Sequence, residues 1–534
     1  WETNDDASVW TWHLRKGMKW SDGAPFDASS FRFYWDKVLR NPDLTKRNPL
    51  LWSAVIDGEY ILADLETPDD TTVIIRYAAP KPLLAWSVRQ GGPYHHPAYS
   101  QQFHAEFVDK GDLDAMVAEA GLQTWDQLYN DKQVWQNNPD LPSLRPWHPK
   151  SAISEELYVA ERNPYFWQVD PEGQQLPYVD RMVHRMFDAI DVLNLWILGG
   201  EIDFQQRHVD LGTYSVLKEG EESGGYDIVF GVDARSIAFG ANLASKDLRL
   251  RELFNDRQFR LAVSYAVNRD EMNEIAFDGM CELRQYSPLK SSPNYYPKLS
   301  YAHLEYQPEE SNRLLDEAGY TERDAEGFRM FKDGSGTITF VMESYWKQGS
   351  AGEDAALMFV QYLADIGIKV SFKTIDRSLY TERIAANDMD ACWSYWNSRT
   401  VLPTVDDNNA GHFTGMTDDP CWAGGFRLWR GDPENPNAVE PPADHFIRKI
   451  WDIYFNEVSQ IMDDDKRNKA FEKLMDIWAE ELPLVGCLGE MPALTIVKRG
   501  LRNFPPGFPN ESAFGAEHLP GTQTYFWENP EEHV

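Results

Sequence analysis

Aromatic side chains are the residues of this sequence best suited to holding a ligand. The 534 residues include 20 Trp, 24 Tyr and 27 Phe. An aromatic face stacks well on a flat or apolar ligand surface, although the same side chains also fill protein cores. The aromatic residues of interest lie in three stretches: Tyr345 and Trp346; Trp393, Tyr395 and Trp396; and Phe413, Trp422, Phe426 and Trp429. From the residues alone, core packing and ligand contact are both open for each of them.

The sequence lacks the common motifs of covalent and metal-assisted catalysis. It contains no G-x-S-x-G, no H-E-x-x-H and no P-loop, and Gly334-Ser-Gly336 is typical of a hairpin turn. The stretch His104-Ala-Glu106 matches part of a zinc deaminase pattern, but residue 424, where the pattern needs a second cysteine after Cys421, is glycine. We therefore expect no catalytic residue, no metal ion and no cofactor.

The balance of charge argues against nucleic acid as a partner. Lys and Arg number 51 and Asp and Glu number 85, which gives a formal charge of −34 at pH 7. A protein of that charge would bind a phosphate backbone against its own electrostatic field. An acidic, aromatic-rich chain could instead be a glycoside hydrolase. No carboxylate pair can be nominated from the sequence, so this stays a distant alternative.

The length of the chain and its cysteines limit the possible architectures and cellular compartments. A chain of 534 residues predicts two or three lobes, and no apolar run approaches the ~18 residues that a membrane-spanning helix needs. Cys281, Cys392, Cys421 and Cys487 lie far apart and form no C-x-x-C pair. They are consistent with one or two disulfides in an oxidising compartment, for which three pairings are possible, or with buried free thiols.

The clearest local pattern lies between residues 353 and 399. Apolar residues from Ala355 to Ile366 recur at helical spacing and are followed by Gly367, which predicts an amphipathic helix that ends at this glycine. Residues 369–375 then alternate between apolar and polar side chains, as in a strand with one buried face.

A second helix and a second strand complete this unit. Residues 378–386 are compatible with a helix, and residues 390–396 form a short, mostly apolar strand. Two strands joined by a helix are expected to run parallel, with a right-handed crossover. The carboxyl edge of such a sheet is where open α/β proteins bind ligands. The residues expected at that edge are Trp396, Asn397, Ser398 and Arg399.

Other stretches also alternate between strand and helix signals, which indicates an α/β protein. Trp10 to Leu14 predicts an aromatic strand, and Phe31 to Leu39 predicts a helix that Ser29 or Ser30 can cap. Residues 131–149 are polar and rich in proline, which is typical of a long surface connection.

Two amphipathic helices are expected near the end of the chain, over residues 446–454 and 471–478. The run Asp463-Asp464-Asp465 lies between them. It lacks the spaced ligands and the glycine of a calcium loop, so we interpret it as a solvated helix start.

A stretch near the start resembles a family signature. Trp10-Thr-Trp-His-Leu-Arg-Lys-Gly-Met-Lys-Trp-Ser-Asp-Gly-Ala-Pro-Phe26 is similar to that of the family-five solute-binding proteins of ABC importers, which bind oligopeptides, dipeptides, nickel chelates or oligosaccharides. Further matches follow in family order: Arg162-Asn-Pro-Tyr-Phe-Trp167, Gly200-Glu-Ile-Asp203, Asn242, Phe254-Asn-Asp-Arg257 with Ala266-Val-Asn-Arg269, and Pro308-Glu-Glu-Ser-Asn-Arg-Leu-Leu315 with Ala318-Gly319. On these residues, the chain is identified as a member of the family.

The resemblance implies an α/β, two-lobed periplasmic-binding-protein-like fold of type II, in the large cluster C class, with a hinge and a ligand cleft between the lobes. Lobe I would comprise residues 1–237 and 490–534, and lobe II residues 238–489. Relatives have a first strand and helix, preceded by a signal sequence, upstream of the position of Trp1. Lobe I is therefore expected to lack its first part here.

The family also implies capture without reaction. Solute would bridge the lobes and shift an open form to a closed one, which docks on the membrane permease subunits of an ABC importer. We therefore expect a monomer that is not an enzyme, located in the periplasm or outside the cell with a lipid anchor.

The solute is expected to be an oligosaccharide or a related polyol, with an oligopeptide as the alternative. Phe103-His104, Trp125, Pro142, Pro146-Trp147 and Asp170-Pro-Glu-Gly173 resemble a large subgroup in which oligosaccharide and opine binders occur beside peptide binders. Aromatic faces stack on sugars while Asn, Asp and Arg hold hydroxyl groups. In the family the Trp that matches Trp396 lies beside the solute. The candidate ligand-binding residues are Trp396, Arg399, Asn397, Trp393, Tyr395, Trp346, Asn242 and Trp422.

Arg399 bears on the choice between sugar and peptide. In peptide-binding relatives the matching strand carries a Trp six residues after its opening Asp, and an Asp three residues later holds the peptide's α-ammonium group. The same count from Asp390 reaches Trp396 and then Arg399, so the charge is reversed. At ~4 Å and an effective dielectric constant of about 20, an attraction of roughly 4 kcal/mol becomes a similar repulsion. The alternative is that Arg399 pairs with Asp406 or Asp407 and does not meet the solute.

Overall fold

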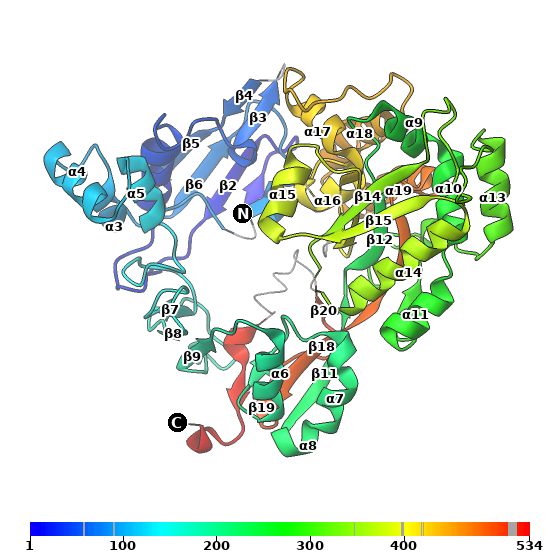
Figure 1. Cartoon of the computed structure of the whole chain (residues 1–534). Helices are drawn as coiled ribbons and strands as arrows, with labels where there is room; N and C mark the ends of the chain where they lie inside the picture. Colours follow the sequence, from blue (N-terminus) through cyan, green and yellow to red (C-terminus); the bar gives the residue numbers. More distant parts are fainter. Residues whose placement is uncertain are drawn as a thin grey trace. The chain divides into compact units, whose positions relative to one another are not determined.

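The computed structural model describes residues 1–56, 59–88, 91–346, 348–396, 400–417, 419, 421–510 and 521–533, without the side chains of residues 55 and 394–396 (Figure 1). The chain forms two compact units. Unit 1 comprises residues 1–196, 499–504 and 521–534, and unit 2 comprises residues 197–498 and 505–520. Helices and strands alternate in both units, as the sequence predicts for an α/β protein.

Unit 1 is built on a four-stranded antiparallel sheet of order β1-β2-β6-β5. The strand predicted from Trp10 is β2, and it pairs with β6 so that Trp10 lies opposite Ile75. Trp10 is fully buried and donates a hydrogen bond from its indole nitrogen to the Ala7 carbonyl oxygen, 3.0 Å away. The strands are β1 (Glu2–Thr3), β2 (Val9–His13), β5 (Asp64–Asp69) and β6 (Thr72–Arg76).

The helix predicted from Phe31 to Leu39 is present, but it begins earlier and its cap differs. Its first part is α1 (Ala28–Phe33), and it continues as a π-helix over Tyr34–Leu39. The predicted cap at Ser29 or Ser30 is wrong, because both serines already lie in the first turn. The side chain of Asp27 instead accepts a hydrogen bond from the Ser29 amide at 2.9 Å.

The rest of unit 1 consists of short helices and small antiparallel sheets. The predicted polar connection runs from the end of α5 to β7, where Trp147 pairs with Arg162 on β8. The elements are β3 (Ser53–Ile56), β4 (Glu59–Leu62), α2 (Leu84–Ser87), α3 (Pro97–Ser100), α4 (Lys110–Glu119), α5 (Trp125–Lys132), β7 (Trp147–Pro149), β8 (Leu157–Arg162), β9 (Arg181–Arg185), β19 (Leu501–Arg502) and β21 (Phe526–Trp527). The helix α6 (Ile190–Leu198) runs across the boundary between the units.

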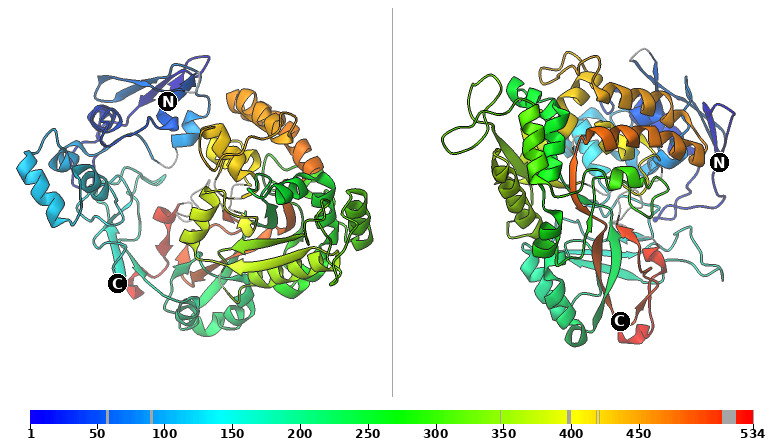
Figure 2. Two further views of the ribbon diagram at one scale, coloured as in Figure 1. Left: turned by 45° about the horizontal axis from the view of Figure 1, so that its top comes forward. Right: turned by 90° about the vertical axis from the view of Figure 1, so that its right-hand side faces the viewer.

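Unit 2 contains two sheets. The four-stranded sheet has the order β10-β18-β11-β20, and its long antiparallel strands β11 and β18 run side by side (Figure 2). Its strands are β10 (Phe204–Gln205), β11 (Tyr226–Asp233), β18 (Met491–Lys498) and β20 (Pro509–Asn510). The six-stranded sheet has the order β13-β17-β12-β16-β14-β15. Its strands are β12 (Ser236–Ala241), β13 (Glu282–Leu283), β14 (Thr339–Ser344), β15 (Lys369–Thr374), β16 (Ala391–Trp396) and β17 (Val485–Gly489).

The pattern predicted between residues 353 and 399 is confirmed as α14 (Ala351–Asp365), β15, α15 (Arg377–Ala385) and β16. Both strands run parallel to β14, which lies between them in the sheet. The two strands joined by α15 are therefore not direct neighbours, because the earlier strand β14 occupies the place between them. Among the described helices, none combines the length and apolar composition needed to span a bilayer.

The remaining helices of unit 2 include ones that lie against β11 of the four-stranded sheet and others that lie against β17 of the six-stranded sheet. The two predicted C-terminal helices are α18 and α19, and Asp463 caps α19 by accepting a hydrogen bond from the Lys466 amide. The helices are α7 (Tyr214–Glu219), α8 (Glu221–Gly224), α9 (Leu248–Asn255), α10 (Arg257–Ala266), α11 (Arg269–Phe277), α12 (Pro297–Ser300), α13 (Pro308–Glu317), α16 (Asp407–Thr414), α17 (Gly424–Gly431), α18 (Phe446–Asn456) and α19 (Asp464–Glu481).

The chain passes between the two sheets of unit 2 at two places, which we call the crossings. The first crossing is Ala234–Arg235, between β11 and β12, and the second is Glu490, between β17 and β18. The lobe boundaries expected at residues 237 and 490 lie close to these crossings, inside unit 2. The division into lobes stays a prediction.

Burial of His445 makes stability depend on pH. Its Nδ1 atom accepts a hydrogen bond from the Ile447 amide at the start of α18, and its Nε2 atom lies 2.7 Å from the Asn255 Oδ1 atom. Burial, with the positive charge of Arg260 nearby, lowers the pKa of His445 to about 4. The unfolded chain, with a histidine pKa of about 6.5, therefore takes up a proton between about pH 6.5 and 4 that the folded chain does not.

We expect the free energy of unfolding to fall as the pH drops through this window, and His445 to account for about 1 to 2 kcal/mol of the loss at pH 5. His445→Asn, which keeps a cap acceptor but does not titrate, should reduce the difference between pH 7 and pH 5 in urea denaturation. An unchanged difference in His445→Asn would contradict this assignment.

Candidate functional site

The carboxyl ends of β14 and β16 share one edge of the six-stranded sheet. The two strands run parallel, with Met342 opposite Ala391 and Glu343 opposite Cys392. Tyr345 and Trp346 follow the end of β14 directly, and β16 ends at Trp396. The shared edge expected from the sequence is therefore present.

Trp346 and Trp393 meet at Gly352 of α14. The Trp393 indole nitrogen donates a hydrogen bond to the Gly352 carbonyl oxygen at 2.9 Å. The Trp346 ring lies so close that a Cβ atom on residue 352 would approach its Cδ2 atom to 2.8 Å. Trp393 is fully buried against Phe359, with 4.9 Å between ring centroids, whereas Trp346 is half-buried.

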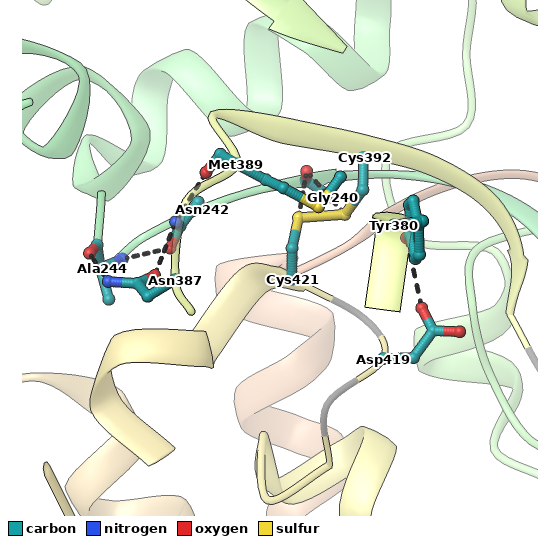
Figure 3. The surroundings of a disulfide bond; sticks show 9 residues. All are labelled: Gly240, Asn242, Ala244, Tyr380, Asn387, Met389, Cys392, Asp419 and Cys421. Atoms are coloured by element: carbon teal, nitrogen blue, oxygen red, sulfur yellow. Dashed lines mark hydrogen bonds between the residues drawn. A yellow bond between two sulfur atoms is a disulfide. The ribbon is translucent and has the colours of Figure 1, made fainter. Parts of the chain in front are cut away.

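A second aromatic group lies beside this edge. The Arg377 guanidinium lies 4.0 Å from the centre of the Tyr345 ring, and the Tyr345 and Tyr380 rings meet edge to face at 4.8 Å. The Tyr380 hydroxyl lies 3.4 Å from the Asp419 Oδ1 atom (Figure 3). Burial raises the pKa of Tyr380 well above its ordinary value. No sequence motif marks Arg377, Tyr380 or Asp419, so none of them is among the predicted site residues.

A disulfide joins β16 to the turn that precedes α17. It links Cys392 with Cys421, close to the Gly240 carbonyl on β12 (Figure 3). Of the alternatives that the sequence leaves open, the structure thus has one disulfide. Cys281 and Cys487 are buried free thiols, and burial raises the pKa of each to about 12.

The side-chain amide of Asn242 makes hydrogen bonds within the protein. Its Nδ2 atom donates to the Asn387 Oδ1 atom at 2.9 Å and to the Met389 carbonyl at 2.8 Å, and its Oδ1 atom accepts from the Ala244 amide (Figure 3). These bonds hold the turn that leads into β16. The Asn242 side chain is thus engaged in this turn, and its predicted contact with solute stays a prediction.

Trp422 also makes core contacts. It is fully buried, donates to the His412 carbonyl at 3.2 Å and stacks on Phe446 with 6.3 Å between ring centroids. The contacts of Trp422 and Trp393 are therefore those of packed residues, and their predicted solute contact stays a prediction.

The other predicted site residues are described only in part. Tyr395 and Trp396 are placed by their backbone, as the last two residues of β16. Asn397 and Arg399 lie outside the described residues. Among the described residues, no group of three His, Cys, Asp or Glu side chains is arranged to hold a metal ion.

Comparison with known families decides the class of this protein. The family described as bacterial extracellular solute-binding proteins, family 5 (middle region), matches residues 1–414. This chain belongs to that family. Family 5 proteins are extracytoplasmic substrate-binding proteins, which bind small-molecule solutes for ABC importers and deliver them to membrane permeases. The resemblance found in the sequence is confirmed.

Two curated relatives differ in the solute that their names give. The periplasmic alpha-galactoside-binding protein of Rhizobium meliloti (strain 1021) is 24% identical over 533 residues, which cover 95% of this chain and 70% of that protein. The periplasmic oligopeptide-binding protein OppA of Escherichia coli (strain K12) is 23% identical over 332 residues, which cover 60% of this chain and 53% of that protein.

Two solved structures also differ in the class of solute that their titles give. An oligopeptide-binding protein OppA is 32% identical with a TM-score of 0.73, and the match covers 99% of this chain and 84% of that one. The periplasmic binding protein MelB from Agrobacterium fabrum C58, in complex with stachyose, is 20% identical with the same TM-score of 0.73, and the match covers 99% and 76%. The expected α/β periplasmic-binding-protein fold is confirmed.

Counting reactive thiols tests the cysteine pairing. We expect iodoacetamide to leave the folded protein unmodified at pH 8, because Cys281 and Cys487 are buried and their pKa values are raised. Unfolding without reductant should expose these two thiols, and reduction should add Cys392 and Cys421. Peptide mass spectrometry reads each step. Alkylation of Cys392 or Cys421 before reduction would contradict the pairing.

Proposed function

We propose that this protein captures an oligosaccharide, with α-galactosides as the first candidates, and presents it to an ABC importer. The observation that carries the proposal is the aromatic edge of the six-stranded sheet, where half-buried Trp346 and Tyr345 follow the end of β14. Apolar sugar faces stack on such rings. The match to the α-galactoside-binding relative over 95% of this chain supports the same class of solute.

Polar side chains near this edge suit sugar hydroxyl groups. Arg399, which follows β16 in the sequence, offers a planar fork of donors, and Asn397 offers both a donor and an acceptor. A small number of such groups within an apolar site sets the orientation of a ligand. Trp396, Tyr395, Trp393, Asn242 and Trp422 remain proposed contributors, by contact or by positioning.

An oligopeptide is the alternative solute. The 32% identity to a solved OppA favours it. The reversed charge at Arg399 opposes it, because a peptide's ammonium group would meet a cation where peptide-binding relatives have an aspartate.

The proposed mechanism is capture by closure. Two lobes, residues 1–237 with 490–534 and residues 238–489, would close on the solute and bend at the crossings, and the closed form would dock on the permease. A monomer in the periplasm, or anchored outside the cell by lipid, fits this role.

Calorimetry with two ligand series tests the proposal. We expect binding of melibiose, raffinose or stachyose, weak or no binding of di- to pentapeptides, and no hydrolysis products. Trp396→Ala should weaken sugar binding by roughly 5- to 100-fold through lost stacking, and Trp396→Phe by less. Micromolar peptide binding that is lost in Arg399→Ala would instead establish the peptide alternative.

Gly352→Ala tests the part played by Trp346. The added Cβ atom forces the indole to move, since it would lie 2.8 Å from the Cδ2 atom. We expect the affinity for sugar to fall severalfold, on the order of 1 kcal/mol. Gly431→Ala in α17 is the matched control, because a Cβ atom there meets nothing within 4 Å. Equal affinities in the two variants would remove Trp346 from the site.

A further inference from the structure

Thr400 joins the candidate site to the first crossing. Its side chain is fully buried, and its hydroxyl group donates a hydrogen bond to the Ala234 carbonyl oxygen at 2.7 Å. Ala234 is also fully buried, and its own amide donates to the Asn510 carbonyl at 3.2 Å. The amide and the carbonyl group of Ala234 are therefore both hydrogen-bonded.

The candidate site lies beside the same crossing in the sheet register. Trp396, the last residue of β16, pairs with Ser236, the first residue of β12. Ser236 is two residues after Ala234, and Thr400 is four residues after Trp396. The first crossing is thus held at two places, by the pairing of the end of β16 with Ser236 and by the hydrogen bond from Thr400 to Ala234.

Thr400 is also connected to the second crossing. Its carbonyl oxygen accepts a hydrogen bond from the Leu289 amide at 3.1 Å, and the next amide, that of Lys290, donates to the Glu490 Oε1 atom at 2.6 Å. Glu490 also pairs with Arg284, which is fully buried. The backbone of Glu490 has a φ of 47°, a left-handed conformation that these contacts hold in place.

Apolar packing surrounds this path. Ala234, Leu289 and Val401 form one buried cluster, against which Val232 and Leu402 pack. The Thr400–Ala234 and Leu289–Thr400 hydrogen bonds therefore lie in a region of low dielectric, where a buried carbonyl left without its donor is costly, whereas the Lys290–Glu490 bond lies at the surface.

We propose that Thr400 is a positioning residue that couples solute binding at the β16 edge to bending at both crossings. This inference rests on the proposed function. The end of β16 is paired with Ser236, two residues after the Ala234 that Thr400 holds, and the Leu289–Lys290 amides connect Thr400 to Glu490. The Thr400 hydroxyl restricts the crossings before solute binds, so less conformational entropy is lost on closure.

Thr400→Val tests the role because it keeps the shape of the side chain and removes the donor. Thr404→Val is the matched control: Thr404 is also buried, and its hydroxyl donates to the Asn468 Oδ1 atom at 2.8 Å, a contact with neither crossing. Thr400→Ser keeps the donor and should behave as the parent protein. If Thr400→Val does not fold, Thr400→Ala makes the same comparison.

Two readouts separate coupling from general destabilisation. In the protein without solute, amide hydrogen exchange at Leu289 and Lys290 should accelerate about tenfold in Thr400→Val and stay unchanged in Thr404→Val. With stachyose as the probe, Thr400→Val should lose about five- to tenfold in affinity and show a smaller decrease in radius of gyration on binding. Thr404→Val should stay within about twofold of the parent affinity.

The outcomes distinguish this inference from the proposed function. Unchanged exchange and affinity in Thr400→Val would overturn the coupling role, as would equal losses in both variants. If the parent protein binds neither sugars nor peptides, the proposal of solute capture fails. The exchange rates then still decide whether Thr400 restrains the second crossing.

Discussion

The place of β16 between β12 and β14 is the constraint on which the rest of unit 2 depends. Hydrogen bonds hold the strand on both edges, antiparallel to β12 and parallel to β14. A slip of one residue would turn every side chain to the opposite face of the sheet. The observed register sets Cys392 opposite Gly240 and Trp393 opposite Phe239, and it brings Trp396 beside Ser236 at the first crossing. The register of this one strand therefore determines the positions of the core residues, the disulfide and the candidate site.

Buried arginines secure the strands around β16. Arg269, on α11, is 1% exposed and donates to the carbonyl oxygens of Gly486, Ser264 and Leu304 at 2.9 to 3.1 Å. Burial lowers the pKa of Arg269. Each N–H group of the guanidinium nevertheless donates a hydrogen bond, and these bonds offset the cost of removing the charge from water. Arg284, which is also buried, pairs with Glu490 near the second crossing and donates to the Ser287 hydroxyl group. These side chains anchor β17 and its exit towards β18.

The net charge of the protein gives little discrimination between the two candidate solutes. A charge of −34 leaves a neutral sugar unaffected and attracts a cationic peptide at long range, but salt screens that attraction beyond about 10 Å. Under the proposed function, discrimination comes from the sheet edge, where Tyr345 and Trp346 lie and the Arg377 guanidinium contacts the Tyr345 ring. A site built from aromatic faces favours ligands with apolar surfaces and hydroxyl rims.

The sequence by itself determined these elements and the family, because both depend on the pattern of residues close together in the chain. The helix over 355–366, the strand over 390–396 and the Trp10 signature can each be recognised without knowledge of distant contacts. It could not pair the cysteines, place β14 between β15 and β16, or tell buried Trp393 from half-buried Trp346, since strand order and burial depend on segments far apart in the chain. Thr400 carries no motif at all. Its bond to Ala234, 166 residues earlier, exists only once the two sheets have folded together, so only the tertiary structure decided that contact.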